Sequence, residues 1–259
     1  MIKGKYHLAT IKPNIDKVGN VAFEADDVLF DWTAFQIPRG GCTLQSLTAI
    51  VAGTNGVAAN GGFGIDLYFA TTVNGVAPPS LGDSNTAMGA ILASAARPYI
   101  IHYQLCQGSK KEDAGDGMVA FNVWGAGNDS YNYPCQVLEG DANFKGDTNY
   151  TATVTGYQTI WIAGVAQGAF DFGTGCDVAG AHSADDLTIV INNVDADDVF
   201  AIGDTIIAFD ADGSGETTIG DVTAVAADLI TVDAAPNIIA DDDEICNLNP
   251  IVLKLGFEY

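Results

Sequence analysis

The residues best suited to chemistry lie in one aspartate-rich segment, Asp210-Ala-Asp-Gly-Ser-Gly-Glu-Thr-Thr-Ile-Gly-Asp221. Counted from Asp210, the side chains of Asp212, Ser214 and Asp221 fall at positions three, five and twelve, with Gly215 at position six. This spacing is close to that of the EF-hand calcium loop, in which these positions supply oxygen ligands or the turn glycine. The segment therefore predicts a Ca²⁺ site made by Asp210, Asp212, Ser214 and Asp221.

A turn without any cofactor explains the same residues. The EF-hand pattern asks for Asp or Asn at position five and a bidentate Glu at position twelve, where this chain has Ser214 and Asp221. The residues before Asp210 form a β-type run, whereas an EF-hand needs an entering helix. Asp and Gly are also the residues that tight hairpin turns prefer. We take the hairpin turn as the first interpretation and calcium binding as the second.

Catalytic groups are sparse in the sequence. The only histidines are His7, His102 and His182, and His102 lies in an apolar run typical of a buried strand. Nucleophilic catalysis needs a nucleophile, a base and an orienting group, and no motif for these is present. We expect a protein that is not an enzyme, with a hydrolase on a β-scaffold as the least favoured alternative.

The five cysteines are widely spaced and form no C-x-x-C pair, which excludes the common zinc and redox motifs. We expect them to be buried free thiols. They are Cys42, Cys106, Cys135, Cys176 and Cys246.

The charge balance excludes several partners. The chain of 259 residues carries 33 Asp and Glu against 10 Lys and Arg, a formal net charge of −23. Such a surface repels nucleic acid and anionic membranes, so neither is an expected partner. No apolar stretch is long enough to cross a membrane, and the N-terminus has no signal-peptide pattern, so we expect synthesis in a cytoplasm.

Short strand-like runs separated by Gly, Asn, Asp and Pro turns fill most of the chain and predict an all-β fold. About 170 residues of this rhythm favour a jelly-roll-like β-sandwich. One helix is expected, over 85–96, because of its Ala, Met and Leu content. We assign 1–186 and 247–259 to the sandwich and expect the runs 187–191 and 251–257 to be paired host strands.

Residues 187–246 are predicted to form a small β-barrel inserted into this sandwich. The runs Gly203-Asp-Thr-Ile, Gly220-Asp-Val-Thr-Ala-Val, Asp228-Leu-Ile-Thr-Val and Ala240-Asp-Asp-Asp-Glu-Ile follow one another at turn-limited intervals. This order resembles a small β-barrel module of bacteriophage virion proteins. The terminal segments 2–6 and 249–259 are similar in style to marine-phage, cyanophage-like virion structural proteins.

The resemblance implies a capsid decoration or cement protein on the outside of a phage head. It implies the major capsid protein as partner and a homo-oligomer, with a trimer as one candidate. The alternative is a tail- or fibre-associated adhesin that binds glycan or Ca²⁺. That alternative needs either the calcium loop or an exposed aromatic platform, and most aromatic residues lie in alternating runs typical of a core.

Overall fold

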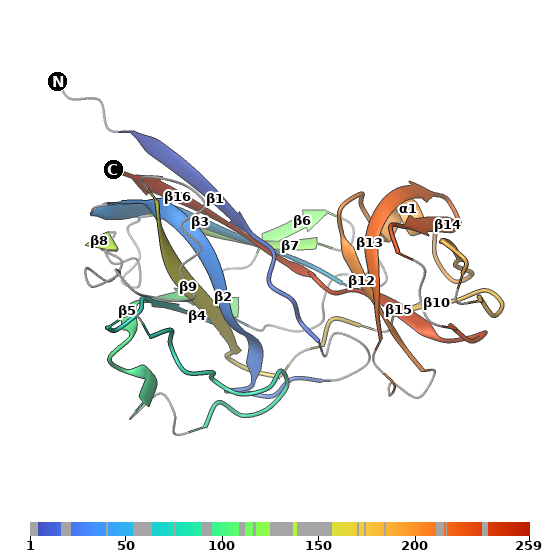
Figure 1. Ribbon diagram of the computed structural model, residues 1–259, viewed down its shortest axis with the longest axis horizontal. Coiled ribbons are helices and arrows are strands. Elements are labelled where there is room, and N and C mark those ends of the chain that lie inside the picture. The colour runs from blue at the N-terminus through green and yellow to red at the C-terminus, as the bar shows by residue number, and fades with distance from the viewer. Residues whose placement is uncertain are drawn as a thin grey trace.

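Two antiparallel sheets packed face to face form the larger part of the computed structural model (Figure 1). The structure describes the whole chain except residues 1–4, 17–21, 40, 54–63, 75, 90–94, 109–111, 116–117, 125–136, 139–156, 170, 174, 184, 211–214, 216 and 235–237. The first sheet has the order β1-β16-β3-β7-β6, with β8 paired to β3, and the second has the order β2-β9-β4-β5.

These strands have the following bounds. The first sheet contains β1 (Tyr6–Ile11), β16 (Ile251–Glu258), β3 (Cys42–Ala52), β7 (Met118–Trp124), β6 (Glu112–Gly115) and β8 (Val137–Leu138). The second contains β2 (Val28–Pro38), β9 (Tyr157–Ala166), β4 (Ile65–Ala70) and β5 (Ile100–Cys106). The first strand lies beside the last one, and β2 lies beside β9, which is the strand order of a jelly roll. The predicted jelly-roll sandwich is confirmed.

Alternation along the strands places the sandwich core. In β16 the side chains of Leu253, Leu255 and Phe257 are fully buried, whereas Lys254 between them is exposed. Residues of one strand point alternately to the two faces of a sheet, so one face of β16 lies inside the sandwich and the other outside. The same pattern in β3 leaves an outer face on which Ile50 is the one large apolar side chain among small and polar ones.

A third sheet is inserted between β9 and β16 and lies at one end of the elongated molecule, opposite the chain termini (Figure 1). Its order is β10-β15-β12-β13-β14-β11. The strands are β10 (Cys176–Asp177), β11 (Thr188–Val190), β12 (Thr205–Phe209), β13 (Thr217–Ala226), β14 (Leu229–Val232) and β15 (Glu244–Asn247), and the helix α1 (Ala196–Val199) follows β11.

The two edges of this inserted sheet meet. Ala179 donates its backbone N–H to the Val190 carbonyl, and Asn192 donates to the Asp177 carbonyl, at 2.8 and 3.1 Å. The sheet therefore closes into the small barrel that the sequence predicts. It begins at β10, ahead of the predicted boundary at residue 187, because the residues after Cys176 pair with β15 and with the end of β11.

The strands β12 and β15 are shared by both parts of the molecule. Ile206 and Ala208 of β12 belong to the apolar cluster inside the barrel, whereas Ile207 and Phe209 belong to the cluster of the sandwich. In β15, Ile245 likewise faces the barrel. Because alternate side chains of one strand serve two cores, the barrel and the sandwich are one packing unit.

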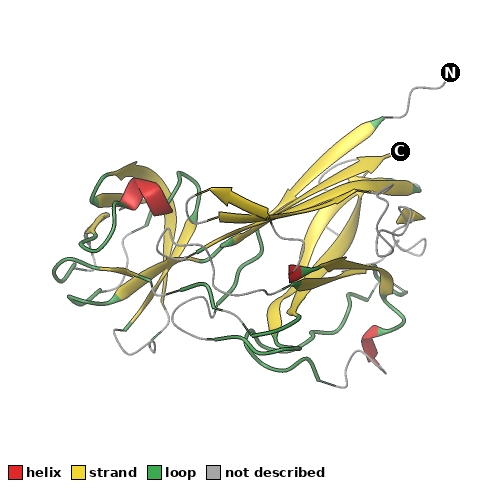
Figure 2. Cartoon of the chain, turned by 180° about the vertical axis from the view of Figure 1, so that it is seen from behind, coloured by secondary structure: helices red, strands yellow, loops and turns green. Residues whose placement is uncertain are grey.

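Two sequence predictions are corrected. The helix expected over 85–96 is absent from its described first part, because Asn85 and Met88 hydrogen-bond to the backbone of Val28 and Asp26 at the edge of the sheet. The expected pairing of 187–191 with 251–257 is also wrong. The strand β11 pairs with β14 inside the barrel, and β16 lies between β1 and β3. Figure 2 shows how little helix the fold contains.

We expect Phe209→Ala to destabilise the whole molecule. Phe209 is 1% exposed, and replacing a buried Phe by Ala typically costs about 3–5 kcal/mol of unfolding free energy. Calorimetry should show one unfolding transition whose midpoint falls by at least about 6 °C. Ile202→Ala, at a side chain that is 72% exposed, is the control and should have almost no effect. Two separate transitions, with only one of them shifted, would contradict the shared-strand arrangement.

Candidate functional site

Two of the four predicted calcium ligands, Asp210 and Asp221, lie at different ends of the β12–β13 pair. Asp221 pairs with Thr205 at the start of β12, and the Thr205 hydroxyl donates to the Asp221 carboxylate at 2.6 Å. Asp210 follows the other end of β12. It is five residues from Thr205, and at the usual rise per residue of a strand this separates the two positions by roughly 16 Å. Asp212 and Ser214 lie outside the described residues. Asp210 and Asp221 therefore cannot bind one ion, and the hairpin interpretation fits their placement.

Several aspartates instead close turns that lead into strands. In three turns the backbone N–H of the first residue donates to the carboxylate of the fourth. The pairs are Glu24 with Asp27, Ala201 with Asp204 and Ala240 with Asp243, at 2.7, 3.0 and 2.7 Å. The third residue of each turn has a positive φ, at Asp26, Gly203 and Asp242.

Each turn stands directly before a strand, namely β2, β12 or β15. The repeated pattern Asp/Gly-Asp before a β-run is thus a turn signal, and it accounts for the acidic residues 241–243 ahead of β15. Nowhere in the described part of the chain do three His, Cys, Asp or Glu side chains gather as a metal site would require.

The histidine and cysteine predictions agree with the structure. His102 is buried, with its ring 5.3 Å from that of Phe69. Cys42, Cys106, Cys176 and Cys246 are buried free thiols, and Cys135 lies outside the described residues. Burial raises the pKa of Cys106 and of Cys176 to about 12, so these thiols stay protonated and unreactive at neutral pH.

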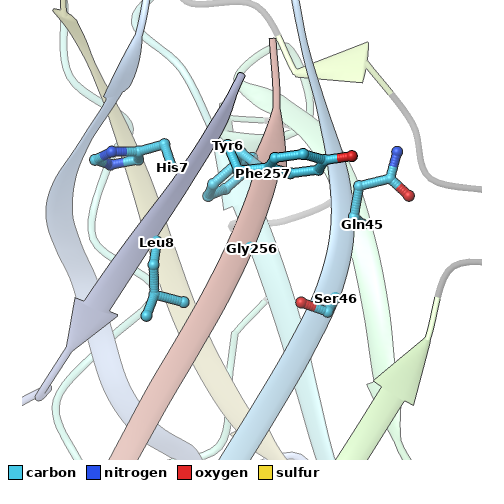
Figure 3. Close-up of a pocket in the computed structure, with 7 residues that line it drawn as sticks. All are labelled: Tyr6, His7, Leu8, Gln45, Ser46, Gly256 and Phe257. Carbon is cyan, nitrogen blue, oxygen red and sulfur yellow. The ribbon is translucent and has the colours of Figure 1, made fainter. Parts of the chain in front are cut away.

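A groove of about 460 Å³ lies on the first sheet, near the chain termini (Figure 3). Tyr6 and Leu8 of β1, Gly256 of β16, and Gln45 and Ser46 of β3 contribute to its lining. The Tyr6 and Leu8 side chains are 75% and 64% exposed, which is unusual for large apolar groups on a strand. The groove is therefore an apolar, solvent-facing surface rather than part of either core.

Gly256 creates the hollow. In the strand register it lies between Leu8 and Ser46, on a residue row that crosses three strands. A Cβ atom at this position would come within 2.5 Å of the Ser46 Oγ. Without a side chain there, the row leaves a gap that the Leu8 side chain borders on one side. Figure 3 shows Gly256 between Leu8 and Ser46.

Charge is distributed unevenly between the two ends of the molecule. Residues 176–247, which form the barrel, hold 17 of the 33 acidic residues and none of the 10 Lys and Arg. Three exposed lysines, Lys5, Lys12 and Lys254, lie on or beside β1 and β16. Lys12 is paired with Asp204 at 3.1 Å, and Lys5 lies over the ring of Tyr259, with 6.0 Å between Nζ and the ring centroid. Lys254 and Glu258 lie on the same face of β16 as Gly256, and the Glu258 carboxylate accepts a hydrogen bond from the Gln45 amide at 2.8 Å.

A second polar cluster lies on the outer face of the other sheet. Asp66 of β4 accepts hydrogen bonds from the Tyr103 hydroxyl and from the Gln167 amide. Burial raises the pKa of Asp66, and these two hydrogen bonds oppose the rise. The rings of Tyr68 and Tyr103 are 5.2 Å apart, and burial raises the pKa of Tyr68 to about 12. Tyr103 is 47% exposed and lies beside the partly buried carboxylate of Asp66.

Sequence reasoning missed both the groove and this cluster. The signal for the groove was present in β1, where the outward positions 6 and 8 are Tyr and Leu although the inward positions 9 and 11 are also apolar. The signal for the Asp66–Tyr103 cluster was the presence of Asp66 and Tyr68, which both carry polar groups, on the same face of one strand. Tyr131 and Tyr133, two aromatic residues in a run rich in Gly and Asn, lie outside the described residues.

The fold and these surfaces define a jelly-roll β-protein with a small acidic barrel inserted before its last strand. No protein-family model matches the chain, and no curated protein is significantly similar to it. Within the described residues, no helix is both long and apolar enough to cross a membrane.

The Asp66 carboxyl should titrate above the usual range near pH 4. Because its folded-state pKa is raised, the stabilisation that its protonation provides is complete below the unfolded pKa and is lost as pH rises through the folded pKa. We expect Tyr103→Phe to raise the Asp66 pKa further, since this variant removes a hydrogen bond to the charged form.

Carbon-detected NMR titration measures this pKa directly. Tyr68→Phe is the matched control: it removes the hydroxyl of the neighbouring ring, which is uncharged in the acidic range, and should leave the Asp66 pKa in place. A pKa at or below the ordinary value in the unmodified chain would contradict the described environment of Asp66.

Proposed function

We propose that this protein is a non-enzymatic structural component of a bacteriophage virion, of the kind that decorates the outside of a capsid. The observation that carries the proposal is the jelly-roll sandwich with a rigidly attached acidic barrel. Jelly rolls are a recurrent fold of virus capsid domains. The runs on which the resemblance to a virion module rests lie in or beside β12, β13, β14 and β15 of this barrel.

The surface of the molecule suits repeated contacts on a shell. The groove at Tyr6 and Leu8 presents apolar side chains to solvent, as interaction surfaces do. The strand β1 is also an edge strand, paired only with β16 among the described strands. Lys5 and Tyr259 exchange both of their backbone hydrogen bonds, so by alternation the backbone groups of Tyr6 and Leu8 point toward the free edge.

Stabilisation of a shell would come from contacts with several major capsid subunits and with neighbouring copies of this chain. Opening the shell would then break these interfaces, and a ligand that binds only the intact state stabilises it by mass action. Many identical sites on a symmetric shell add avidity to contacts that are individually weak. The localisation proposed is the capsid exterior, after synthesis in the host cytoplasm.

We expect the purified chain to co-sediment with capsids that lack it and to saturate at a fixed number of copies per capsid. Saturation distinguishes specific sites from adsorption. Capsids at saturation should open at a temperature several degrees higher than undecorated capsids in the same heating experiment, because the chain binds the closed shell. Absence of co-sedimentation, or binding that leaves the opening temperature of the capsid unchanged, would contradict the proposed function.

The Tyr68 and Tyr103 pair is the observation that favours a second candidate, a glycan-binding adhesin. Protein sites for sugars combine an aromatic ring with hydrogen-bonding groups, and Tyr103 has Asp66 and Gln167 beside it. This candidate predicts glycan binding that Tyr103→Ala reduces at least about tenfold, the equivalent of one lost stacking contact of roughly 1.4 kcal/mol. A glycan array probed with both forms decides it, with Leu8→Ala as the control on the opposite sheet. No binding by the unmodified chain eliminates the candidate.

A further inference from the structure

The outer edge of β1 carries backbone groups that have no partner among the described strands. Lys5 and Tyr259 exchange both of their backbone hydrogen bonds. By alternation, Tyr6, Leu8 and Thr10 direct their N–H and C=O groups away from β16. Figures 1 and 2, which show the molecule from opposite sides, place no described strand outside β1. A further strand can therefore be added to the sheet at this edge.

The other edges of the sandwich are covered, charged or mostly shielded from solvent. At the edge of β2, Val28 exchanges backbone hydrogen bonds with residues 85–86, and the Gln36 carbonyl accepts from the His7 side chain at 3.1 Å. The edge strand β6 begins with Glu112, and charged side chains discourage pairing between edges. In β5 one residue of seven is exposed, against three of six in β1. The edge of β1 is therefore more accessible than these three edges.

The side chains along this edge are uncharged, although the molecule is strongly acidic. Tyr6 and Leu8 are 75% and 64% exposed, and Thr10 is exposed as well. Residues 1–15 contain no acidic residue, although the chain holds 33 of them. Two copies that meet through these segments therefore bring none of their carboxylates together, which matters because each copy has a net charge of −23.

The edge is complementary to itself. If two copies of β1 pair antiparallel about a two-fold axis at Leu8, that residue lies opposite the partner's Leu8, and Tyr6 lies opposite the partner's Thr10. All the outward-facing backbone groups of the strand are then hydrogen-bonded, and an aromatic residue opposite a β-branched one is a favourable cross-strand pair. The same register places Lys5 opposite the partner's Ile11, so the lysines of the two copies do not face each other. No charged side chain on this edge would select a foreign peptide, whereas a second copy matches it fully.

We propose that two copies of this chain join through β1, antiparallel about a two-fold axis at Leu8, so that the first sheet continues from one copy into the other. Because both copies use the same edge, the assembly closes at two copies. The contact is a single strand pair and is smaller than a standard protein interface, so free copies associate weakly. The pairing does not rest on the proposed virion role, because it uses only groups of the free chain.

Sedimentation of the purified chain at high concentration tests the pairing. The dimer fraction should rise when the salt is increased from about 0.05 M to about 0.5 M, because salt screens the repulsion between two acidic copies. Leu8→Lys places like charges opposite each other on the axis and should weaken the dimer at least about tenfold. This variant also makes each copy less acidic, so stronger overall repulsion cannot explain a lost dimer.

Ile238→Lys is the matched control, because it adds the same charge at an exposed apolar side chain of the barrel. It should dimerise at least as well as the unmodified chain. A chain that stays monomeric at both salt concentrations, or one that forms a trimer, would overturn the proposal. So would equal dimerisation of the Leu8→Lys and Ile238→Lys variants.

Disulfide trapping tests the register in a Cys135→Ser background, since the four described native thiols are buried. Copies with Tyr6→Cys and copies with Thr10→Cys should form the mixed dimer at least about tenfold faster than either forms a dimer with itself. In the proposed register, position 6 lies opposite position 10. The two positions 6 are four residues apart along the strands, or roughly 13 Å, which is too far for a disulfide. Equal rates for the mixed and the like pairs would contradict the proposal.

Discussion

The strand pair β12–β15 is the constraint on which the rest of the structure depends. Its side chains alternate between two apolar clusters, with Ile206 and Ile245 in the barrel and Ile207 and Cys246 in the sandwich. A strand buried on both faces needs apolar residues at consecutive positions, and the run Ile206-Ile-Ala-Phe209 supplies them. If β12 and β15 separated from one core, apolar side chains of the other core would also be exposed to solvent. The inserted barrel and the sandwich therefore depend on the same strand pair.

The junction between the two parts is tied by polar contacts as well. The Asn249 side-chain amide donates to the carbonyls of Lys12 and Pro13 and to the Asn14 side chain, at 3.3, 3.0 and 2.9 Å. Leu248 donates its N–H to the Thr205 carbonyl at the start of β12. These bonds lie where the chain passes from β15 into β16. The acidic barrel and the groove over Gly256 are therefore held at a fixed separation, which a flexible linker would not provide.

Much of the fold could be predicted from the sequence, because jelly-roll strands with one buried face show period-two alternation. The strands β3 and β16 show this alternation in their burial, and the run 251–257 of β16 is predicted from the sequence. The described first part of the helix expected over 85–96 is not helical, because tertiary contacts override local propensity there. Asn85 has a positive φ there and pairs with β2 rather than beginning a helix. The barrel boundary was misplaced because the two-residue strand β10 is too short to show any period.

The candidate sites were harder to predict, for physical reasons. The spacing Asp210 to Asp221 mimics a calcium loop in one dimension, but an extended hairpin places its ends far apart, whereas an EF-hand loop curls them around one point. The groove depends on residues from β1, β3 and β16, which are brought side by side only by the jelly-roll strand order. Gly256 and the exposed Leu8 are neighbours in the sheet but lie 248 residues apart in the chain. A local sequence pattern therefore cannot predict that they lie side by side.

Electron cryo-microscopy of particles from the source of this chain would test its proposed role most directly. The account predicts elongated, two-lobed density on the outer capsid surface, with each copy contacting several shell subunits and the smaller lobe matching the barrel. Density confined to the tail or fibres, or particles that lack the chain altogether, would contradict it.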